Sequence, residues 1–252
     1  LASGPDACFA VQVVAGLASE YAENSCPLSI EVGGERICEM EFETGPDEYS
    51  GSWRDLGFMF GPECVTGNSA DIVFRVGQFK TVGDVPWDSQ VMVKRLRVKR
   101  LVAADRLDIE VGRQGDEWFL ADGFYGREGD TRAGGPAWRW TRQRARVLVP
   151  VKKGKGQASL RVRYLLEGRP QTMPVPEPEF AWNGEVLSGT VSTGRAGSAR
   201  CADVRFELSA GQASRRVNTL EIRSPVWIPS DHGLGTDNRE LGIMMCSVSV
   251  VR

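Results

Sequence analysis

Histidine is almost absent from this chain of 252 residues, which contains only His232. Its six cysteines include no pair with the CxxC spacing. A zinc site is therefore not expected, because such sites are built from closely spaced cysteine and histidine ligands. A Ser-His-Asp hydrolase is also disfavoured, since the single histidine stands in a glycine-rich turn and no GxSxG elbow occurs.

Long apolar runs and amphipathic helices are missing too. The longest apolar stretches, such as VLVPV at 147–151, are far shorter than the roughly 20 residues that cross a bilayer, so no membrane span is expected within the chain. Only residues 15–24 could form a few helical turns, and Gly16 weakens that segment. No glycine-rich phosphate loop leads from a strand into a helix, which argues against nucleotide chemistry. Because the chain starts at Leu1 without methionine or a signal peptide, we expect a processed chain or a piece of a longer one.

Short valine-rich segments in which apolar and polar residues alternate dominate the chain. Period-two alternation between glycine and proline residues indicates antiparallel strands with one buried face. With 29 glycines and 13 prolines, the composition fits a sandwich or a barrel, and we predict an all-β protein. The segments are 9–14, 28–32, 71–76, 91–101, 158–166, 203–208, 215–224 and 247–251.

An internal repeat relates the two halves of the chain. LSIEVGGERI at 28–37 matches EFAWNGEVL at 179–187, and Gly34 and Gly184 each close a two-residue turn of the kind that tight hairpins use. The repeat predicts two tandem antiparallel β-sandwiches of jelly-roll type. Three further pairs of segments keep the same order, 8–16 with 159–168, 70–76 with 215–224, and 85–98 with 234–250, the last placing Asp88 opposite Asp237.

Residues 107–151 have no counterpart at the start of the chain. We interpret them as the opening strands of the second copy, which places the domain boundary near residues 103–105. The length suits two domains of about 100–150 residues each. We therefore predict a first sandwich over 1–103 and a second sandwich over 104–252. The first is either a trimmed copy or one whose opening strands lie upstream in a longer protein.

The second half carries a recognisable set of motifs: GFYGRE and WRWTRQRARVLVPV within 123–151, a WNG hairpin at 182–184, and RSPVWIPSD and GTDNRELGIMM within 223–245. With these motifs, residues 105–252 resemble the β-sandwich accessory modules at the carboxyl ends of bacterial membrane and cell-surface glycosyltransferases. The resemblance implies a jelly-roll-like, noncatalytic module that accompanies glycan-building machinery and binds carbohydrate. It extends more weakly, through the repeat, to 8–103. The chain contains no transferase domain, so the resemblance does not imply transferase activity.

The cysteines are even in number and lie apart, which favours disulfides. Confining the bridges to domains leaves Cys201–Cys246 in the second copy and two bridges in the first. This interpretation predicts an extracytoplasmic location, and the alternative is buried free thiols in a reducing cytoplasm. The disulfide candidates are Cys8, Cys26, Cys38, Cys64, Cys201 and Cys246.

Two acidic loops raise the question of catalysis, since a glycosidase needs two carboxylates roughly 5–10 Å apart. The candidate acids are Glu128, Asp130, Asp231, Asp237 and Glu240. The favoured alternative is structural: Asp237 starts a turn by holding backbone amides, and Arg239 pairs with an acid such as Glu128. We therefore expect no catalytic residue. We also expect no cofactor: the loop at 230–240 has the oxygen ligands that calcium prefers, but it does not have the spacing of a calcium loop.

Aromatic residues and arginines gather between residues 118 and 146. Alternation puts Trp138 and Trp140 on one face of a strand, where they form either a carbohydrate platform or part of the core. The predicted carbohydrate contacts are Tyr125, Trp138, Trp140, Arg139 and Arg142.

Charge is balanced overall at −2, but residues 131–166 contain ten basic groups and no acid. This run is either a solvated strand face or a surface for acidic glycans or an acidic partner. Nucleic acid is not expected, because no recognition motif accompanies it. The sequence thus predicts a noncatalytic, extracytoplasmic module that binds glycan or docks on a protein surface in a cell-surface assembly. The alternatives are a self-assembling structural subunit of a surface layer, filament or envelope complex, and a glycan-active hydrolase or lyase.

Overall fold

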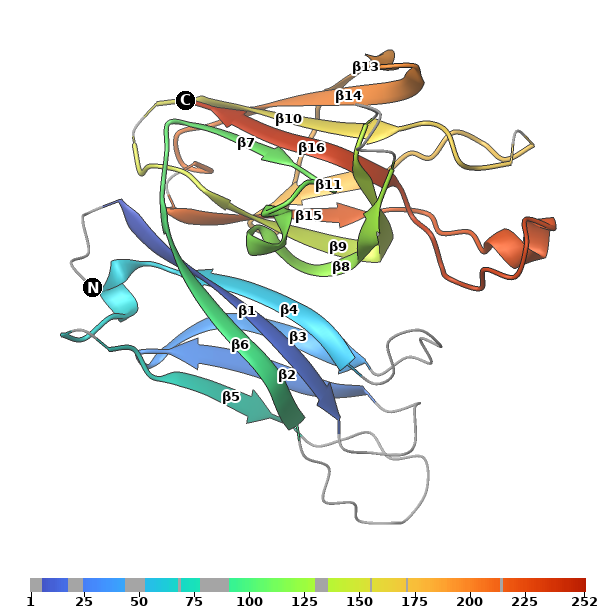
Figure 1. Cartoon of the computed structure of the whole chain (residues 1–252). Helices are drawn as coiled ribbons and strands as arrows, with labels where there is room; N and C mark the ends of the chain where they lie inside the picture. Colours follow the sequence, from blue (N-terminus) through green and yellow to red (C-terminus); the bar gives the residue numbers. More distant parts are fainter. Residues whose placement is uncertain are drawn as a thin grey trace. The chain divides into compact units, whose positions relative to one another are not determined.

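The computed structural model describes residues 6–17, 25–43, 53–67, 69–77, 91–129, 136–154, 156–170, 172–213 and 215–252. These residues form an all-β protein that divides into two compact units, Leu1–Val102 and Ala103–Arg252 (Figure 1). Helix in the described parts is limited to 3₁₀ turns of three or four residues, and none is long enough to cross a membrane. In the segment 15–24, where Gly16 disfavours helical turns, residues 15–17 belong to a strand and the others lie outside the described ranges.

Unit 1 is a sandwich of two three-stranded antiparallel sheets with strand orders β4-β1-β6 and β3-β2-β5. Apolar residues at every second position of β1, such as Phe9 and Val11, share one buried cluster with Leu28 and Ile30 of β2 and Phe58 of β4. The predicted alternation therefore forms a core between the two sheets. The strands are β1 (Ala7–Leu17), β2 (Ser25–Val32), β3 (Glu35–Glu43), β4 (Trp53–Phe60), β5 (Ile72–Val76) and β6 (Val91–Val102).

Unit 2 joins ten strands in the order β12-β11-β15-β9-β16-β10-β14-β13, with β7 paired to β16 and β8 paired to β9. The strands are β7 (Arg106–Glu110), β8 (Leu120–Glu128), β9 (Trp138–Pro150), β10 (Ala158–Leu165), β11 (Glu179–Trp182), β12 (Glu185–Val186), β13 (Thr190–Ala196), β14 (Ala199–Leu208), β15 (Val217–Arg223) and β16 (Met244–Val251).

The predicted repeat is present in the strand pairing. In unit 1, β1 lies between β4 and β6, and β2 lies between β3 and β5; in unit 2, β10 lies between β14 and β16, and β11 lies between β12 and β15. Both hairpin turns have positive φ at two successive residues, 57° and 84° at Gly33 and Gly34, and 53° and 89° at Asn183 and Gly184. This is the geometry of a tight two-residue hairpin, which glycine and asparagine adopt most readily.

Strands β7, β8 and β9 are the additions that distinguish unit 2. Residues 144–150 of β9 pair with β15, while residues 139–140 pair with the start of β16. β9 therefore runs from one layer of the sandwich to the other and closes its side. β7 covers the outer edge of β16, where Ile109 stands opposite Val248.

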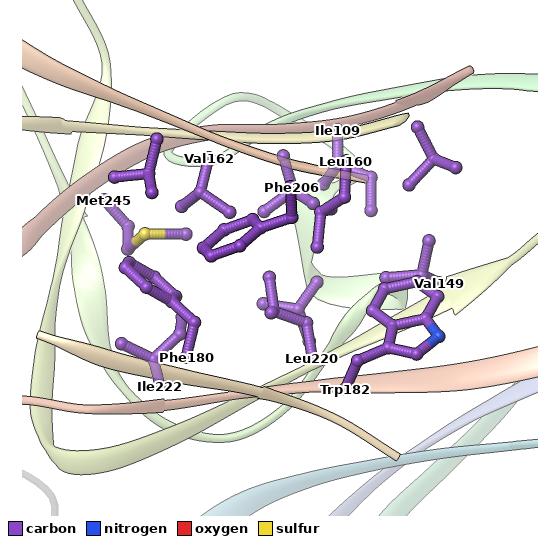
Figure 2. Packing of buried hydrophobic residues seen from close by; sticks show 14 of the residues in the cluster. Ile109, Val149, Leu160, Val162, Phe180, Trp182, Phe206, Leu220, Ile222 and Met245 are labelled. Atoms are coloured by element: carbon purple, nitrogen blue, oxygen red, sulfur yellow. The ribbon is translucent and has the colours of Figure 1, made fainter. Parts of the chain in front are cut away.

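The core of unit 2 lies between these layers (Figure 2). Leu160, Val162 and Phe206 come from one layer and face Phe180 and Ile222 of the other. The rings of Phe180 and Phe206 meet edge to face across the core, with centroids 5.5 Å apart. At the apolar stabilisation of roughly 25 cal/mol per Å², each fully buried side chain of this kind contributes about 1.5–3 kcal/mol.

The expected disulfide between Cys201 and Cys246 is not formed, and Cys64, Cys201 and Cys246 are free thiols. Cys201 on β14 and Cys246 on β16 flank opposite edges of β10. Strands two apart in a sheet are separated by roughly 9–10 Å, whereas a disulfide needs Cα atoms about 4.4–6.8 Å apart. The intervening strand therefore keeps the two thiols from bonding. Cys8 is buried, Cys38 is half-buried, and the side chain of Cys26 is outside the described part of the chain.

Candidate functional site

One end of unit 2 gathers most of the residues that the sequence analysis singled out. It is formed by the end of β8, the start of β9, and the loop at 224–243 that leads from β15 into β16. We call this region the loop end. Gly129 makes the approach of the first two strands possible: with φ at 102°, it lies against Trp138, where a Cβ atom would fall 2.7 Å from the indole ring.

Backbone hydrogen bonds hold the loop at 224–243 in one shape. Trp227 and Leu241 exchange two bonds, with N···O distances of 3.0 and 2.9 Å, so the loop is closed at its base. At its tip, Ser230 donates its amide to the carbonyl of Asp237 at 3.0 Å. The 3₁₀ turn Pro229–His232 ends at Gly233, whose φ of 71° reverses the chain. The loop is therefore fixed by its own backbone.

Arg239 fastens this loop to the β8 strand. Its guanidinium donates to both oxygens of Asp237, at 3.0 Å to Oδ1 and 2.8 Å to Oδ2, and to Oε1 of Glu128 at 3.0 Å. Asp237 also accepts the backbone amide of Arg239 at 3.0 Å, as expected of an acidic turn. The bonds from Arg239 hold the pKa of Asp237 below its usual value. The sequence predicted the pair of Arg239 with Glu128 and the turn that starts at Asp237, and Arg239 binds both acids.

Tyr125 lies below this network, with only 8% of its surface exposed. The guanidinium carbons of Arg142 and Arg239 lie 4.5 and 5.1 Å from the centre of its ring, within the range of cation–π attraction. Its hydroxyl donates to the carbonyl of Glu240 at 3.2 Å. Tyr125 is therefore an internal support of the loop end, and its ring face is not offered to a ligand.

Asp116 is the residue of this region that the sequence analysis missed. Its carboxylate is fully buried and accepts two bonds from Arg139, at 2.6 and 2.8 Å, one from Arg127 at 3.2 Å and one from the amide of Gly112 at 2.7 Å. Arg139 also donates to the carbonyl of Tyr125 at 3.0 Å. These bonds and the 14% exposure of its side chain give Arg139 a structural role in place of the predicted contact with sugar.

The tryptophan pair divides between core and surface. Trp140 is 5% exposed and packs edge to face against Trp227, with centroids 6.0 Å apart, so it is part of a second apolar cluster. It cannot serve as an exposed platform, and the core alternative holds for this residue. Trp138 is half-buried and packs against the same cluster.

The exposed polar groups of the loop end stand on the fixed loop. The ring of His232 lies 6.0 Å from that of Trp227 and is exposed to solvent. Asn238 is held by a 2.6 Å bond from the hydroxyl of Ser230 to its side-chain oxygen, which leaves its amide group directed to no described partner. The exposed polar side chains are Asp231, His232, Thr236, Asn238 and Glu240.

Catalysis and metal binding find little support in this arrangement. A glycosidase needs a carboxylic acid with a raised pKa, and the pKa of Asp237 is lowered instead. Asp130, one of the candidate acids, lies outside the described residues. Across the described ranges, no group of three or more histidine, cysteine, aspartate or glutamate side chains is arranged to hold a metal ion.

The described residues of the basic run at 131–166 are not an open positive surface, because acids from other parts of the chain pair with most of their basic groups. Asp203 on β14 binds both Arg161 and Arg163; burial opposes ionisation of Asp203, but the bonds from the two arginines lower its pKa. The other pairs are Arg139 with Asp116, Arg144 with Glu221, Arg146 with Asp122, and Lys152 with Asp105. The residues of the run are thus mainly partners in structural ion pairs.

No protein-family model and no curated protein matches the chain. Among solved structures, the chain is similar to a family 35 carbohydrate-binding module from Cellvibrio japonicus, with 17% identity, a TM-score of 0.33, and coverage of 58% of this chain and 93% of that one. A tandem of family 22 carbohydrate-binding modules from Paenibacillus barcinonensis is 12% identical, with a TM-score of 0.30 and coverage of 99% and 80%. Tandem family 51 modules of a Streptococcus pneumoniae glycoside hydrolase are 11% identical, with a TM-score of 0.29 and coverage of 99% and 79%.

Proposed function

We propose that the protein is a noncatalytic module that binds carbohydrate through the loop end of unit 2. The observation that carries the proposal is the set of exposed hydrogen-bonding side chains on a loop that its own backbone fixes. Sugar hydroxyls need donors and acceptors at set positions, and groups that are already fixed lose little conformational entropy on binding. Asp231 and Glu240 supply acceptors, Asn238 supplies donors, and His232 supplies a flat ring beside Trp227.

The ion pairs beneath the loop support a binding role over a catalytic one. Arg239 lowers the pKa of Asp237 and donates a hydrogen bond to Glu128, so both acids serve as ion-pair partners of one arginine. A fixed ion pair serves well to position neighbouring groups. Arg142 of β9 is half-buried and lies over the ring of Tyr125, so it adds a polar group to the same end of the unit.

The biological setting belongs to the same proposal. We place the module outside the cytoplasm, where surface polysaccharides are found. We also propose that it is an accessory to glycan-building machinery, because the motifs within 123–245 resemble those of glycosyltransferase accessory modules. Fractionation of the native host with an antibody against the chain tests the location. Recovery in the cytoplasmic fraction alone would reject this part of the proposal without touching the binding site.

Affinity gel electrophoresis against a panel of soluble polysaccharides tests the binding site. We expect retardation by at least one glycan and a loss of tenfold or more in affinity for the double variant His232→Ala/Asn238→Ala, about 1.4 kcal/mol. Because both side chains are exposed, the variant should unfold at the same denaturant concentration as the wild type.

Glu207→Ala is the matched control for this experiment. Glu207 is also exposed, but it lies on β14 away from the loop end: it stands opposite Ser159 of β10, which pairs with Val251 near the end of β16. Its variant should bind like the wild type. Equal binding by wild type and the double variant, or release of reducing sugar that Glu128→Gln abolishes, would overturn the proposal.

A further inference from the structure

The two units differ in the exposure of apolar side chains at one side of the sandwich. In unit 2 this side is closed by β7 and β9. In β16, Val248 and Val250 are 0% and 1% exposed, and in β15 Leu220 and Ile222 are both fully buried. The residues of β6 that face the core of unit 1 are far more exposed: Leu96 is 44%, Val98 51% and Val102 63% exposed. Among the described residues, nothing covers the side of unit 1 that corresponds to the closed side of unit 2.

The register shows that these β6 residues belong to the core face. Val98 stands opposite Val11, and Leu96 stands opposite Val13, both of which are buried between the sheets of unit 1. Side chains directly opposite each other in an antiparallel pair point to the same face. Leu96 and Val98 therefore point to the same face as the core residues of β1. They are exposed because no described residue packs over them.

The outer edge of β6 also differs from the corresponding edge in unit 2. In unit 2, β7 pairs along the corresponding edge of β16, with Ile109 opposite Val248 and Leu107 opposite Val250. Within the described residues, no strand pairs with the second edge of β6. An exposed edge with apolar side chains is a site at which an extended segment can add to a sheet.

The positive charge of β6 favours an acidic strand at its free edge. β6 contains five basic residues and no acid. A second copy pairing edge to edge through β6 would place basic residues beside basic residues, which destabilises a cross-strand pair. The strand that fills the equivalent place in unit 2, RLDIE at 106–110, alternates apolar and acidic residues.

We propose that unit 1 binds an extended segment of a partner polypeptide, in which apolar residues alternate with acids, as an added strand on the free edge of β6. Its apolar face covers Leu96 and Val98, and its acids lie beside the arginines of β6, such as Arg95. This interaction surface is independent of the carbohydrate site, which belongs to unit 2.

Binding of a fluorescent ten-residue peptide that alternates valine with glutamate tests the proposal, measured by anisotropy with the full chain. We expect saturable binding that weakens tenfold or more for the double variant Leu96→Lys/Val98→Lys. This variant keeps the positive charge of β6, so its loss of affinity reports the apolar contact. The same peptide with lysine in place of glutamate should not bind.

The matched control is Val191→Lys/Thr193→Lys on β13, an edge strand of unit 2 on which Val191 is 65% exposed. It should bind the peptide like the wild type, and circular dichroism checks that both variants are folded. If the L96K/V98K pair does not fold, Val102→Lys replaces it. Equal affinity for the glutamate and lysine peptides, unchanged binding by the β6 variant, or a wild-type dimer that the β6 variant dissociates would each overturn the proposal.

Discussion

Arg139 and Asp116 form a bidentate ion pair, with Nε to Oδ2 at 2.6 Å and Nη2 to Oδ1 at 2.8 Å. The pair ties β9 to the 3₁₀ turn Asp116–Trp118, and through Gly112 it fixes the chain that follows β7. One buried carboxylate therefore joins β9 to the segment after β7, and neither strand has a counterpart among the described residues of unit 1.

Removing Asp116 should destabilise unit 2 strongly, because the guanidinium of Arg139 would remain largely buried without its partner. We expect Asp116→Ala to lower the free energy of unfolding by about 3–5 kcal/mol. Tryptophan fluorescence in urea measures this in unit 2, which holds five of the seven tryptophans. Asp108→Asn, at an exposed pair with Arg106, should change it by less than about 1 kcal/mol. Equal losses in the two variants would contradict the buried role of Asp116.

Acid should weaken the loop end through Asp237. Its folded-state pKa is lowered by Arg239, so the folded protein binds fewer protons than the unfolded chain near pH 4. The stabilisation is then complete above the unfolded pKa and is lost as pH falls through the folded pKa. We expect stability measured from pH 6 to pH 3 to fall less steeply in Arg239→Ala than in the wild type. The exposed Arg205→Ala serves as control and should keep the wild-type slope.

The sequence was informative wherever a local signal carried the structure. Valine alternation predicted the strands, and the Gly-Gly and Asn-Gly turns at 33–34 and 183–184 disclosed a repeat that the strand pairing confirms. The unmatched residues 107–151 were identified as added strands for the same reason, since a repeat shows what one copy lacks.

Long-range pairing was beyond the sequence. Nothing local to Asp116 indicates that it meets Arg139, because 23 residues separate them and many arginines compete. Alternation showed that Trp138 and Trp140 share a strand face without showing that the loop at 224–243 covers Trp140 through Trp227. The basic run at 131–166 looked uncompensated because the acids that pair with it lie elsewhere in the sequence.

Gly33 and Asn183 occupy equivalent positions in the two hairpin turns. Replacing each by the other residue should destabilise the protein to different extents. A Cβ atom at Gly33 would lie 2.4 Å from the carbonyl oxygen of Cys64, so Gly33→Asn forces the backbone apart although φ suits asparagine. Asn183 has room, and its side chain bonds the carbonyl of Gln212 and the amide of Thr219. We expect Asn183→Gly to cost about 1–2 kcal/mol through these bonds, and Gly33→Asn to cost more. Chemical denaturation of both variants checks the order, and the reverse order would contradict it.

The thiols of unit 2 should remain reduced and slow to react. Burial raises the pKa of Cys246 to about 12, which leaves almost no thiolate near neutral pH. We expect a reducing agent to leave the melting temperature of unit 2 unchanged, and iodoacetamide to modify Cys246 only after unfolding. Mass spectrometry after labelling under native and denaturing conditions measures this. A lower melting temperature on reduction would instead indicate a structural bridge.

The pairing of β7 with β16 has a practical meaning beyond the fold. Val251 stands opposite Arg106, and the amide of Arg252 donates to the carbonyl of Asp105 at 2.9 Å, so the entry and exit of unit 2 are neighbours. A domain whose two ends meet can be inserted into a surface loop of another protein without stretching either chain. Unit 2 is therefore suited to transplantation as a self-contained cassette, displaying its loop end on a host scaffold.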